Sequence, residues 1–389
     1  MTALQASEEL AKRGHVIDLV YRVDGESKAE YSRFCRSMTQ VPNLRLEPKA
    51  LLRSLRRAAP VAWRVRRTRP DVVFVHSLMA VPWGTMAAEL SGSALVCLLH
   101  EVDPYRHVTV SVLRRRVDMF MAVCDFARDS YIELGLDPAR VDTVYCGIAL
   151  ERYKFGGMSE RKAARAALGL PAEGFVAIYF GRLDPDKCVD VLLEAWSQLS
   201  GDPEQRRLII LGSPVLHPDP DAYLRELKAH APSSCIWIPM QSDVVQFLHA
   251  ADLVVCPSRR EALCRVVLEG LATGRPVLAS NVGGIPEILT GELSRFLVEP
   301  EDVAGFTKGI ESLTDWRSVE PELAEKCAAR VAAKFKLSES IDDLEEALRK
   351  AVAIRARRRL SLGTVAAFID WVISARQGRT SRDSRGTVG

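Results

Sequence analysis

The chain has 389 residues, which at roughly 150 residues per domain predicts two or three domains with ample hydrophobic cores. A hydrophobic fraction of 48% and a charged fraction of 26% are typical of globular proteins and exclude collagen-like, disordered and disulfide-scaffold chains. The net charge of +3 hides an uneven distribution of +4 over residues 1–150, −7 over residues 151–350 and +6 over residues 351–389. Positive charge is therefore in excess in the first part of the chain and in the tail.

The sequence carries no sign of a membrane span or of secretion. It contains no run of about 18 apolar residues, and its first ten residues lack both a basic and an apolar segment. We therefore expect a cytoplasmic protein. The nine cysteines include no C-x-x-C pair and several lie within apolar runs, so we interpret them as reduced core residues and expect no zinc site.

Short apolar runs alternate with helical stretches after an expected first helix at residues 3–13. The nine expected strands are residues 15–21, 71–75, 94–99, 119–123, 176–180, 207–211, 235–238, 253–256 and 276–279. Continuously apolar strands joined by helices indicate buried parallel strands, and hence doubly wound α/β layers. The polar, Gly-rich residues 147–175 divide the strands into two sets. We therefore predict two sheets, with ligands bound outside the carboxyl ends of their strands.

Two segments are strongly basic. Residues 53–69 contain seven arginines and no acid, which predicts a basic helix that is either a solvated face or a contact for a membrane or an acceptor. In the tail, arginines flank the apolar residues 362–373, which indicates a helix docked on the body or one lying on an anionic membrane. Nucleic-acid binding is not expected, because no aromatic-interleaved motif accompanies the charge.

The segment 180–187 carries the first chemical signal. A strand is followed by Gly181, Arg182 and Lys187, and then by the helical run 189–199. Two cations beside a helix N-terminus favour a phosphate, for which no metal ion is needed. The alternative is a surface salt bridge to Asp184 or Asp186.

The segment 257–276 carries the second signal, because Glu261 and Glu269 are eight residues apart across a helix start. Helical geometry gives a separation of roughly 12 Å and a rotation of about 80°, which lets both carboxylates face one cleft. The two carboxylates of a glycosidase lie about 5–9.5 Å apart, so a hydrolytic pair is excluded. The spacing suits the ribose and the sugar at the two ends of a nucleotide-sugar.

Together these segments resemble the retaining glycosyltransferases of family 4. The motifs that carry the resemblance are Gly181-Arg182 with Lys187, Glu261 with Glu269, Gly274-Arg-Pro-Val277, Gly283-Gly-Ile-Pro-Glu287, Arg13-Gly-His15 and His100-Glu101. The resemblance covers about residues 8–350 in the same order. It implies the GT-B fold, in which two Rossmann-like domains face a central cleft.

The resemblance also implies a domain layout. Residues 1–148 would form an acceptor-side domain and residues 149–335 a nucleotide-sugar-binding domain. Residues 336–353 would form a helix that returns to the first domain, and residues 354–389 a basic amphipathic tail.

By the same resemblance the donor would be bound mainly by the second domain. The diphosphate would be held by Arg182 and Lys187 after the Gly181 turn, the ribose by Glu269, and the transferred sugar by Glu261. The backbone N–H groups of Leu263, Cys264 and Arg265 would complete the cradle. His100 would lie near the donor sugar, although a histidine at a strand end is as readily explained by a structural hydrogen bond.

The family's usual mechanism implies attack on the same face as the leaving group, whose phosphate takes the acceptor's proton. Donors aimed at the departing oxygen would stabilise that transition state. We therefore expect neither a protein general base, nor a metal ion, nor another cofactor.

The chain departs from the family's pattern at several places. The first strand and its Gly-rich turn are absent, which predicts a start codon assigned too late or a truncated protein. Cys146-Gly-Ile-Ala149 replaces the N-G-[IV]-D turn, Ala262-Leu-Cys264 lacks the usual glycines, and Cys188 replaces a glycine. These changes leave the donor's base and sugar open.

The leading hypothesis is a retaining glycosyltransferase that moves a hexose from a nucleotide diphosphate-sugar to a glycan, lipid-linked or small-molecule acceptor. Residues 53–69 and 355–385 would place it at the inner face of a membrane. The first alternative is a GT-B binding or scaffold protein without turnover, suggested by the missing strand. The second is a GT-B sugar-nucleotide epimerase.

Overall fold

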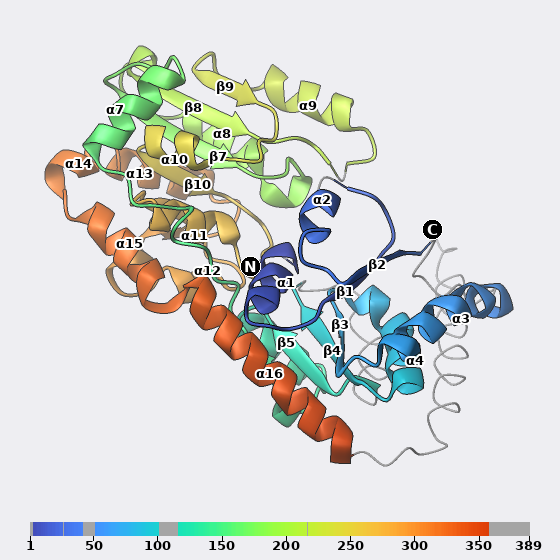
Figure 1. The fold of residues 1–389 in the computed structure, drawn as a ribbon. Helices are drawn as coiled ribbons and strands as arrows, with labels where there is room; N and C mark the ends of the chain where they lie inside the picture. The colour runs from blue at the N-terminus through green and yellow to red at the C-terminus, as the bar shows by residue number, and fades with distance from the viewer. Residues whose placement is uncertain (1–2, 26, 42–50, 101–115, 216, 358–389) are drawn as a thin grey trace, which may run out of the picture. The chain divides into compact units, whose positions relative to one another are not determined.

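The computed structural model describes residues 3–25, 27–41, 51–100, 116–215 and 217–357, and over residues 51–59 it describes the backbone alone. The chain divides into two compact units (Figure 1). Unit 1 comprises Met1–Tyr145 and Ser340–Gly389, and unit 2 comprises Cys146–Glu339. The domain boundaries expected after residues 148 and 335 lie close to these divisions.

Unit 2 is built on one sheet of six parallel strands in the order β12-β11-β10-β7-β8-β9. Its strands are β7 (Phe175–Phe180), β8 (Arg206–Leu211), β9 (Cys235–Ile238), β10 (Leu253–Cys256), β11 (Val277–Ser280) and β12 (Leu297–Val298). The central strands β7 and β10 are buried along their whole length, as their continuous apolar sequence predicts. All five strands expected in this part of the chain are confirmed, and only the two-residue β12 was missed.

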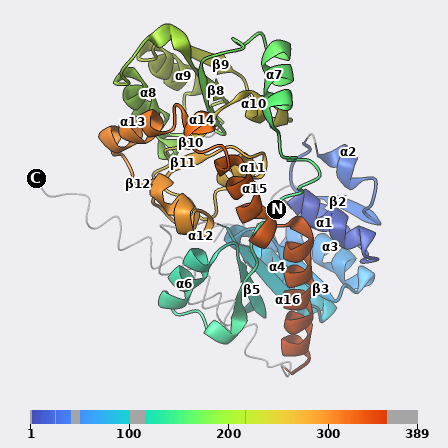
Figure 2. The ribbon, with the colours of Figure 1, turned by 90° about the vertical axis from the view of Figure 1, so that its left-hand side faces the viewer.

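Helices lie on both faces of this sheet (Figure 2). They are α7 (Met158–Ala167), α8 (Val189–Ser197), α9 (Pro220–Ala229), α10 (Val245–Ala250), α11 (Arg265–Ala272), α12 (Ile285–Ile288), α13 (Val303–Ser312), α14 (Trp316–Val319) and α15 (Leu323–Lys334). Side chains satisfy free N–H groups at several starts: Asp219 accepts from Ala222 before α9, and Asp302 accepts from Gly305 before α13. The expected helical run 189–199 is confirmed as α8.

A buried charge cluster stabilises unit 2 at the amino end of β10. The carboxylate of Asp252 accepts from Arg161 at 2.8 Å, Arg165 at 2.6 Å and Arg317 at 2.9 Å, and also from the N–H of Val176 on β7. Burial alone would raise the pKa of Asp252, but the three guanidinium groups outweigh it and the pKa lies below its ordinary value. Asp252 therefore joins two strands to helices α7 and α14.

The described residues of unit 1 form two separate parallel sheets. In one, β1 (Asp18–Tyr21) pairs with β2 (Ser37–Gln40). The other has the order β3 (Val72–Val75), β4 (Ala94–Leu99), β5 (Met119–Ala122) and β6 (Val141–Thr143). The four strands expected here are confirmed, and β2 and β6 were missed.

The two sheets of unit 1 share no strand. Within the described ranges, no strand joins the β1–β2 pair to the β3 edge. Residues 72–74 of β3 are partly exposed, whereas β4 is buried at all positions but one.

Helices of unit 1 cover these sheets. They are α1 (Ala3–Lys12), α2 (Lys28–Tyr31), α3 (Leu51–Thr68), α4 (Val81–Ser91), α6 (Asp125–Glu133) and α16 (Leu337–Arg357). The first helix expected at residues 3–13 is confirmed as α1, and the basic helix expected at residues 53–69 as α3. Helix α4 packs against β3 and β4, and α6 against β5 and β6.

Ion pairs attach α16 to the rest of unit 1. Arg13 binds Asp342 at 2.6 Å, Lys350 binds Asp142 at 3.0 Å, and Arg355 binds Glu89 through two hydrogen bonds of 3.0 Å. Helix α16 thus packs on the first unit.

Helix α16 ends at Arg357, and the remaining tail to residue 389 lies outside the described residues, as does Glu101. The predicted amphipathic tail and its membrane contact are therefore not tested. None of the helices in the described ranges combines the length and hydropathy needed to cross a bilayer.

Candidate functional site

Two loops of unit 2 meet at the carboxyl ends of the neighbouring strands β7 and β10. One follows β7 and includes the short 3₁₀ helix Pro185–Lys187, and the other runs from β10 to α11. The N–H of Arg259 donates to the carbonyl of Asp186 at 2.8 Å, and the Arg260 guanidinium binds the Asp186 carboxylate at 2.8 Å. The two sequence segments that carried the chemical signals are thus joined, at the edge where α/β sheets bind ligands.

A glycine turn holds the second loop in place. Gly283 has a φ of +58°, and a Cβ there would lie 1.8 Å from the carbonyl oxygen of Glu261. The next residue, Gly284, donates its N–H to the carbonyl of Ala262 at 2.7 Å. The backbone at residues 283–284 therefore fits directly against residues 261–262, and a side chain at position 283 would displace Glu261.

Lys187 and Glu261 form the centre of the site. The Lys187 Nζ lies 2.5 Å from Glu261 Oε1, and Ser258 Oγ donates to the same oxygen at 2.9 Å. Burial alone would lower the pKa of Lys187, but the Glu261 carboxylate outweighs it and the pKa is raised above its ordinary value. Lys187 is therefore charged at neutral pH and positioned by a carboxylate. The ion-pair partner of Lys187 is thus Glu261, while the expected alternative, a salt bridge to Asp184, is formed by Arg182.

Glu269 lies on α11 and is nearly buried. Its side chain is 10% exposed and accepts from Arg265 at 2.9 Å, one turn earlier on the same helix. The Tyr153 hydroxyl also hydrogen-bonds to Glu269, and burial together with that carboxylate raises the pKa of Tyr153 to about 12. Tyr153 was missed by the sequence analysis because it lies in a segment that we interpreted as a separator between the strand sets.

Glu261 and Glu269 do not lie on one helix. The expected separation of about 12 Å assumed that they do, so that assumption is wrong. Helix α11 begins at Arg265, and Glu261 lies in the loop before it. Leu263, Cys264 and Arg265 do lie at the start of this helix, where the first N–H groups have no partner within the helix. The helix N-terminus therefore adds donors and a positive dipole end to the site.

Arg182 and Gly181 complete the set of predicted donor residues. The Arg182 guanidinium binds the Asp184 carboxylate at 3.1 Å, as in the structural alternative, while its side chain stays 45% exposed. Gly181 has a φ of +146° and lies directly against Gly212. A Cβ on Gly212 would lie 2.0 Å from the carbonyl oxygen of Gly181. Arg182 is thus presented at the surface by a turn that only glycine allows.

Cys188, which follows Lys187, has a φ of +49°. This left-handed conformation is unfavourable for a residue with a Cβ, which explains why a glycine suits this position. The departure from the family's pattern therefore changes backbone strain next to the site and leaves Lys187 in place.

In unit 1, His100 and His76 follow neighbouring strands. His100 comes directly after β4 and is exposed, and His76 comes directly after β3, which pairs with β4 in parallel. Burial, with a smaller contribution from His100, lowers the pKa of His76 to about 4, so that its imidazole is neutral at neutral pH. The rule that selected His100, a histidine at a strand end, would also have found His76.

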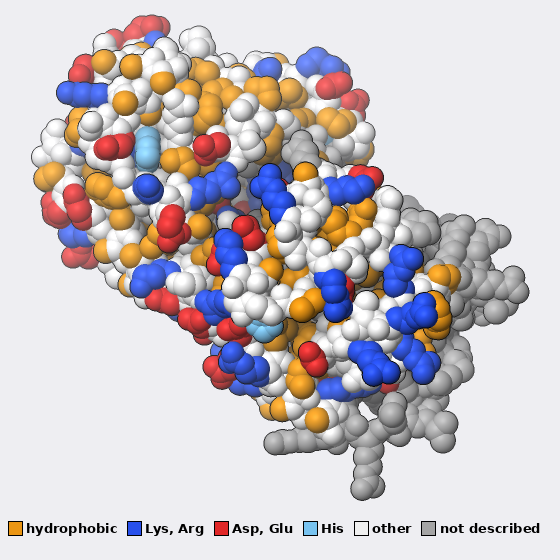
Figure 3. Space-filling view, viewed as in Figure 1, with side chains coloured by type: hydrophobic (Ala, Val, Ile, Leu, Met, Phe, Trp, Pro, Cys, Tyr) orange, Lys and Arg blue, Asp and Glu red, His pale blue; other side chains and the backbone are white. Residues whose placement is uncertain are grey.

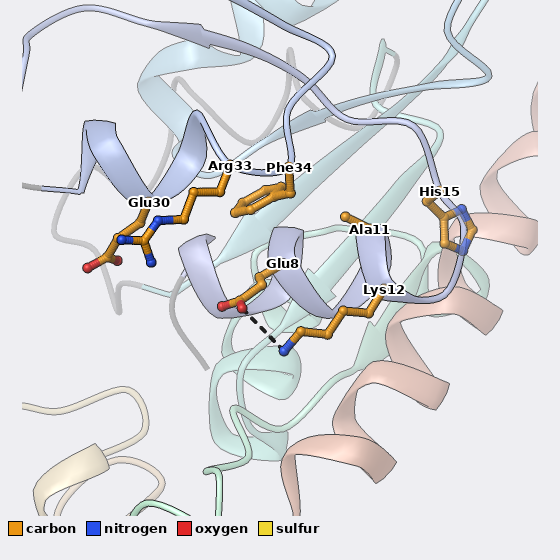
Figure 4. A pocket seen from close by; sticks show the side chains of 7 residues that line it. All are labelled: Glu8, Ala11, Lys12, His15, Glu30, Arg33 and Phe34. Carbon is orange, nitrogen blue, oxygen red and sulfur yellow. Dashed lines mark ion pairs between the residues drawn. The ribbon is translucent and has the colours of Figure 1, made fainter.

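The Arg13-Gly-His15 motif has structural partners in unit 1. Arg13 binds Asp342 and Glu345, and His15 Nε2 lies 2.6 Å from Glu345 Oε1. Nearby, a cavity of about 530 Å³ opens between α1 and α2 (Figure 4). Its lining residues are Glu8, Ala11, Lys12, His15, Glu30, Arg33 and Phe34. This cavity combines cations, carboxylates and one aromatic ring.

One group of side chains in the described ranges has the arrangement of a metal site: Cys256, Glu261 and Cys264, whose ligand atoms lie within 4.8 Å of one another. The carboxylate of this group already binds the ammonium of Lys187. A cation would have to displace that ammonium, so the residues present do not favour a metal ion.

Comparison with known families assigns both parts of the chain. Residues 160–334 match the model described as Glycosyl transferases group 1, and residues 1–152 match that of Glycosyltransferase Family 4. The D-inositol 3-phosphate glycosyltransferases of Mycobacterium bovis and Mycobacterium tuberculosis are 34% identical over 234 residues. That match covers 59% of this chain and 47% of each relative, so the chain spans about half the length of the curated relatives it matches.

Solved structures share the fold at lower identity. Anabaena HepE in complex with UDP and glucose superposes with a TM-score of 0.77 at 20% identity, over 89% of this chain and 94% of that one. A glycosyltransferase from Rickettsia africae gives 0.75 at 18% identity, over 90% and 93%. Sucrose-phosphate synthase from Thermosynechococcus elongatus gives 0.72 at 20% identity, over 90% and 92%.

The parallel sheets of the two units and these neighbours establish a two-domain, Rossmann-like GT-B fold. Two family models match the chain from residue 1 to residue 334 with a gap of only a few residues. The chain belongs to glycosyltransferase family 4.

Proposed function

We propose that this protein is a retaining glycosyltransferase that moves a hexose from a nucleotide diphosphate-sugar to a hydroxylated acceptor. The observation that carries the proposal is the joined pair of loops at β7 and β10. They gather Lys187, Glu261, Arg182 and the start of α11 at one edge of unit 2. The cations and helix N–H groups suit a diphosphate, and the neighbouring carboxylates suit the hydroxyl groups of the sugars attached to it.

Each residue has a role in the proposed transfer. Lys187, Arg182 and the N–H groups at the start of α11 bind the diphosphate and stabilise the charge that develops on it as the glycosidic bond breaks. Glu269, fixed by Arg265 and Tyr153, accepts from the ribose hydroxyls. Glu261, fixed by Lys187 and Ser258, accepts from the transferred sugar.

The acceptor oxygen attacks the anomeric carbon on the face that the diphosphate leaves. The bond from that carbon to the diphosphate oxygen breaks, the new glycosidic bond forms, and the acceptor's proton moves to the departing oxygen. The two cations supply the positive charge that a metal ion would otherwise provide, so we expect full activity in the presence of a chelator.

The acceptor is proposed to bind unit 1 in the cavity between α1 and α2. Lys12 and Arg33 line it together with Glu8 and Phe34 (Figure 4). Arg33 has no ion-pair partner within the described ranges, so its charge is available to an anionic group on the acceptor. The curated relatives are named for D-inositol 3-phosphate, and a phosphorylated polyol of that kind suits this lining.

The test is donor binding and turnover with UDP-glucose, since HepE was solved with UDP-glucose and with UDP and glucose. We expect UDP-glucose to raise the melting temperature of the full chain and to be turned over slowly even with water as the acceptor. Binding without turnover would support the scaffold alternative, and conversion to another UDP-sugar the epimerase. No shift with UDP-, GDP-, ADP- or TDP-sugars would contradict the proposal.

A control variant distinguishes loss of the site lysine from loss of a positive charge elsewhere on the protein. Lys187→Ala should abolish the shift, because it removes the ammonium and leaves the Glu261 carboxylate facing the phosphates. Lys228→Ala, an exposed lysine on α9, should leave the shift unchanged.

We also propose that α3 contacts an anionic membrane surface. Trp63 is 55% exposed and stacks under Arg67, whose guanidinium lies 4.2 Å from the ring centre. Arg64 and Arg66 are exposed on the same helix, and Figure 3 shows a concentration of Lys and Arg side chains over this part of unit 1. An amphipathic aromatic ring beside several cations is typical of helices that bind acidic headgroups.

Vesicle binding tests this contact. We expect the protein to sediment with vesicles of phosphatidylglycerol at low salt and to be released by salt. Arg64→Glu with Arg67→Glu should abolish binding, and Arg225→Glu on α9 should not. Equal binding of neutral and anionic vesicles, or none at low salt, would contradict it.

A further inference from the structure

Two thiols of unit 2 are in direct contact beside the proposed donor site. Cys256 is the last residue of β10, and Cys264 caps the start of α11. Their Sγ atoms are 3.3 Å apart, and each residue is only 3% exposed. A disulfide has an S–S length of about 2.05 Å, so the atoms need to approach by little more than about 1 Å.

The surroundings favour reaction at Cys256. The hydrogen bond from Cys264 lowers the pKa of Cys256 below its ordinary value, and the nearby Lys187 ammonium acts in the same direction. The hydrogen bond to Cys256 and burial raise the pKa of Cys264 well above its ordinary value. One thiol is thus poised as the attacking thiolate and the other as the proton-bearing partner.

We propose that Cys256 and Cys264 form a reversible disulfide on exposure to hydrogen peroxide, and that this bond weakens donor binding. The Cys256 thiolate attacks one peroxide oxygen and the O–O bond breaks. Hydroxide is the leaving group, and Cys256 becomes a sulfenic acid. The Cys264 sulfur then attacks the Cys256 sulfur, the S–O bond breaks, and water leaves with the proton of Cys264. Overall the two thiols are oxidised and the peroxide is reduced to two waters, and a dithiol reductant reverses the reaction.

The bond would act on donor binding through the loop between the two cysteines. That loop carries Ser258 and Glu261, which contact each other, and Glu261 also binds Lys187. Drawing the two sulfurs together shifts the end of β10 toward the start of α11, and with it the carboxylate that positions Lys187. This effect on the donor rests on the proposed function, whereas formation of the disulfide does not.

A soft metal ion is the other chemistry that these thiols suggest. Cys256, Cys264 and Glu261 form a cluster of the right size, but the ammonium of Lys187 occupies the carboxylate and repels a cation. The contact between the two sulfurs has no such competitor. The disulfide is therefore the reaction that the geometry favours.

The first experiment maps the bond. The reduced full chain is treated with hydrogen peroxide, its remaining thiols are alkylated, and its tryptic peptides are analysed by mass spectrometry. Trypsin cuts after Arg259, Arg260 and Arg265, so a Cys256–Cys264 bond joins two separate peptides. We expect this pair in the wild type and its loss on treatment with dithiothreitol.

Control variants make the mapping specific. Cys235 lies on the same tryptic peptide as Cys256, so Cys235→Ser must retain the linked pair. Cys256→Ser and Cys264→Ser must each lose it, and either one suffices if the other fails to fold. Absence of the linked pair in the wild type overturns the proposal. So does protection of both thiols by one bound Zn²⁺ with no linkage after its removal.

The second experiment measures the consequence. The dissociation constant of UDP-glucose is compared before and after oxidation, and we expect at least tenfold weaker binding that dithiothreitol restores. Cys256→Ser should be insensitive to peroxide. An unchanged dissociation constant in fully linked protein overturns the effect on the donor. Failure of the reduced protein to bind any nucleotide-sugar contradicts the proposed function and leaves the mapped disulfide standing.

Discussion

The two units are built on the same plan but differ in how their sheets are completed. In each unit a buried aspartate precedes a central strand and accepts from the N–H of the neighbouring strand: Asp252 from Val176 in unit 2, and Asp118 from Leu95 in unit 1. In unit 2 three arginines surround the aspartate, and six strands form one continuous sheet. Unit 1 divides its strands between two sheets.

This difference concerns how firmly each unit holds its loops. Unit 2 fixes its loops by a continuous sheet, by Gly283 and by ion pairs, so the side chains of the proposed donor site are held in place before any ligand binds. Unit 1 has a polar cavity between α1 and α2, and its strands β1 and β3 are short and partly exposed. We interpret unit 2 as the pre-organised half of the molecule.

The largest expected effect tests that pre-organisation at Asp252. Asp252→Asn removes the charge that compensates three buried guanidinium groups, which should lower the free energy of unfolding by about 3 kcal/mol or more. Chemical denaturation followed by circular dichroism measures this loss. Asp315→Asn, an exposed aspartate before α14, should change stability by less than about 0.5 kcal/mol. Equal effects of the two variants would refute a structural role for the cluster.

The contribution of the same cluster should also appear in the pH dependence of the free energy of unfolding of the wild-type protein. The pKa of Asp252 is lower in the folded protein than its ordinary value of 3.8, because the arginines outweigh burial. Its contribution is therefore fully present above that value and is lost as pH falls through the lower, folded pKa. Asp252→Asn should flatten the stability curve below about pH 4. A wild-type curve as flat as the variant's would contradict this linkage.

The next effect in size concerns ribose binding in unit 2. Glu269→Ala removes a charged acceptor worth about 1.5–3 kcal/mol, so UDP-glucose should bind roughly tenfold to a hundredfold more weakly. Calorimetry measures the dissociation constant. Glu226→Ala on α9, an exposed glutamate, serves as the matched control. Unchanged affinity in Glu269→Ala would remove the ribose role.

The smallest effect tests the cavity of unit 1. Arg33→Ala removes one exposed cation from its lining, and exposed charge pairs contribute about 1 kcal/mol or less, so KM for inositol phosphate should rise about threefold to fivefold. With kcat and the KM for UDP-glucose unchanged, the loss would lie in acceptor binding alone. Arg225→Ala is the control. A lower kcat with the acceptor KM unchanged would place Arg33 outside acceptor binding.

Strand positions were predictable wherever a strand is buried on both faces. Leu253–Cys256 and Phe175–Phe180 read as unbroken apolar runs because helices cover both sides of them. The strand Ser37–Gln40 was missed because it carries polar residues and pairs with a single neighbour among the described strands. The short strands Val141–Thr143 and Leu297–Val298 carry too few residues to show a pattern.

The sequence selected the residues of the candidate site but not their pairing. Motifs and spacing along the chain pointed to Lys187, Glu261 and Glu269, because those residue types suit a phosphate and two sugars. They could not show that Lys187 binds Glu261, because 74 residues separate them and only the parallel pairing of β7 with β10 brings their loops together. Tyr153 was missed because its segment was interpreted as a separator between the strand sets.

The sequence by itself determined the α/β class, the two strand sets, the family and the identity of the charged side chains, because these depend on local hydrophobic pattern and on short motifs. The tertiary structure decided which charges meet, where α11 begins, that Cys188 adopts a left-handed conformation and that Cys256 touches Cys264. Such contacts depend on strand order and loop packing, and residues far apart in the chain carry no local signal of either.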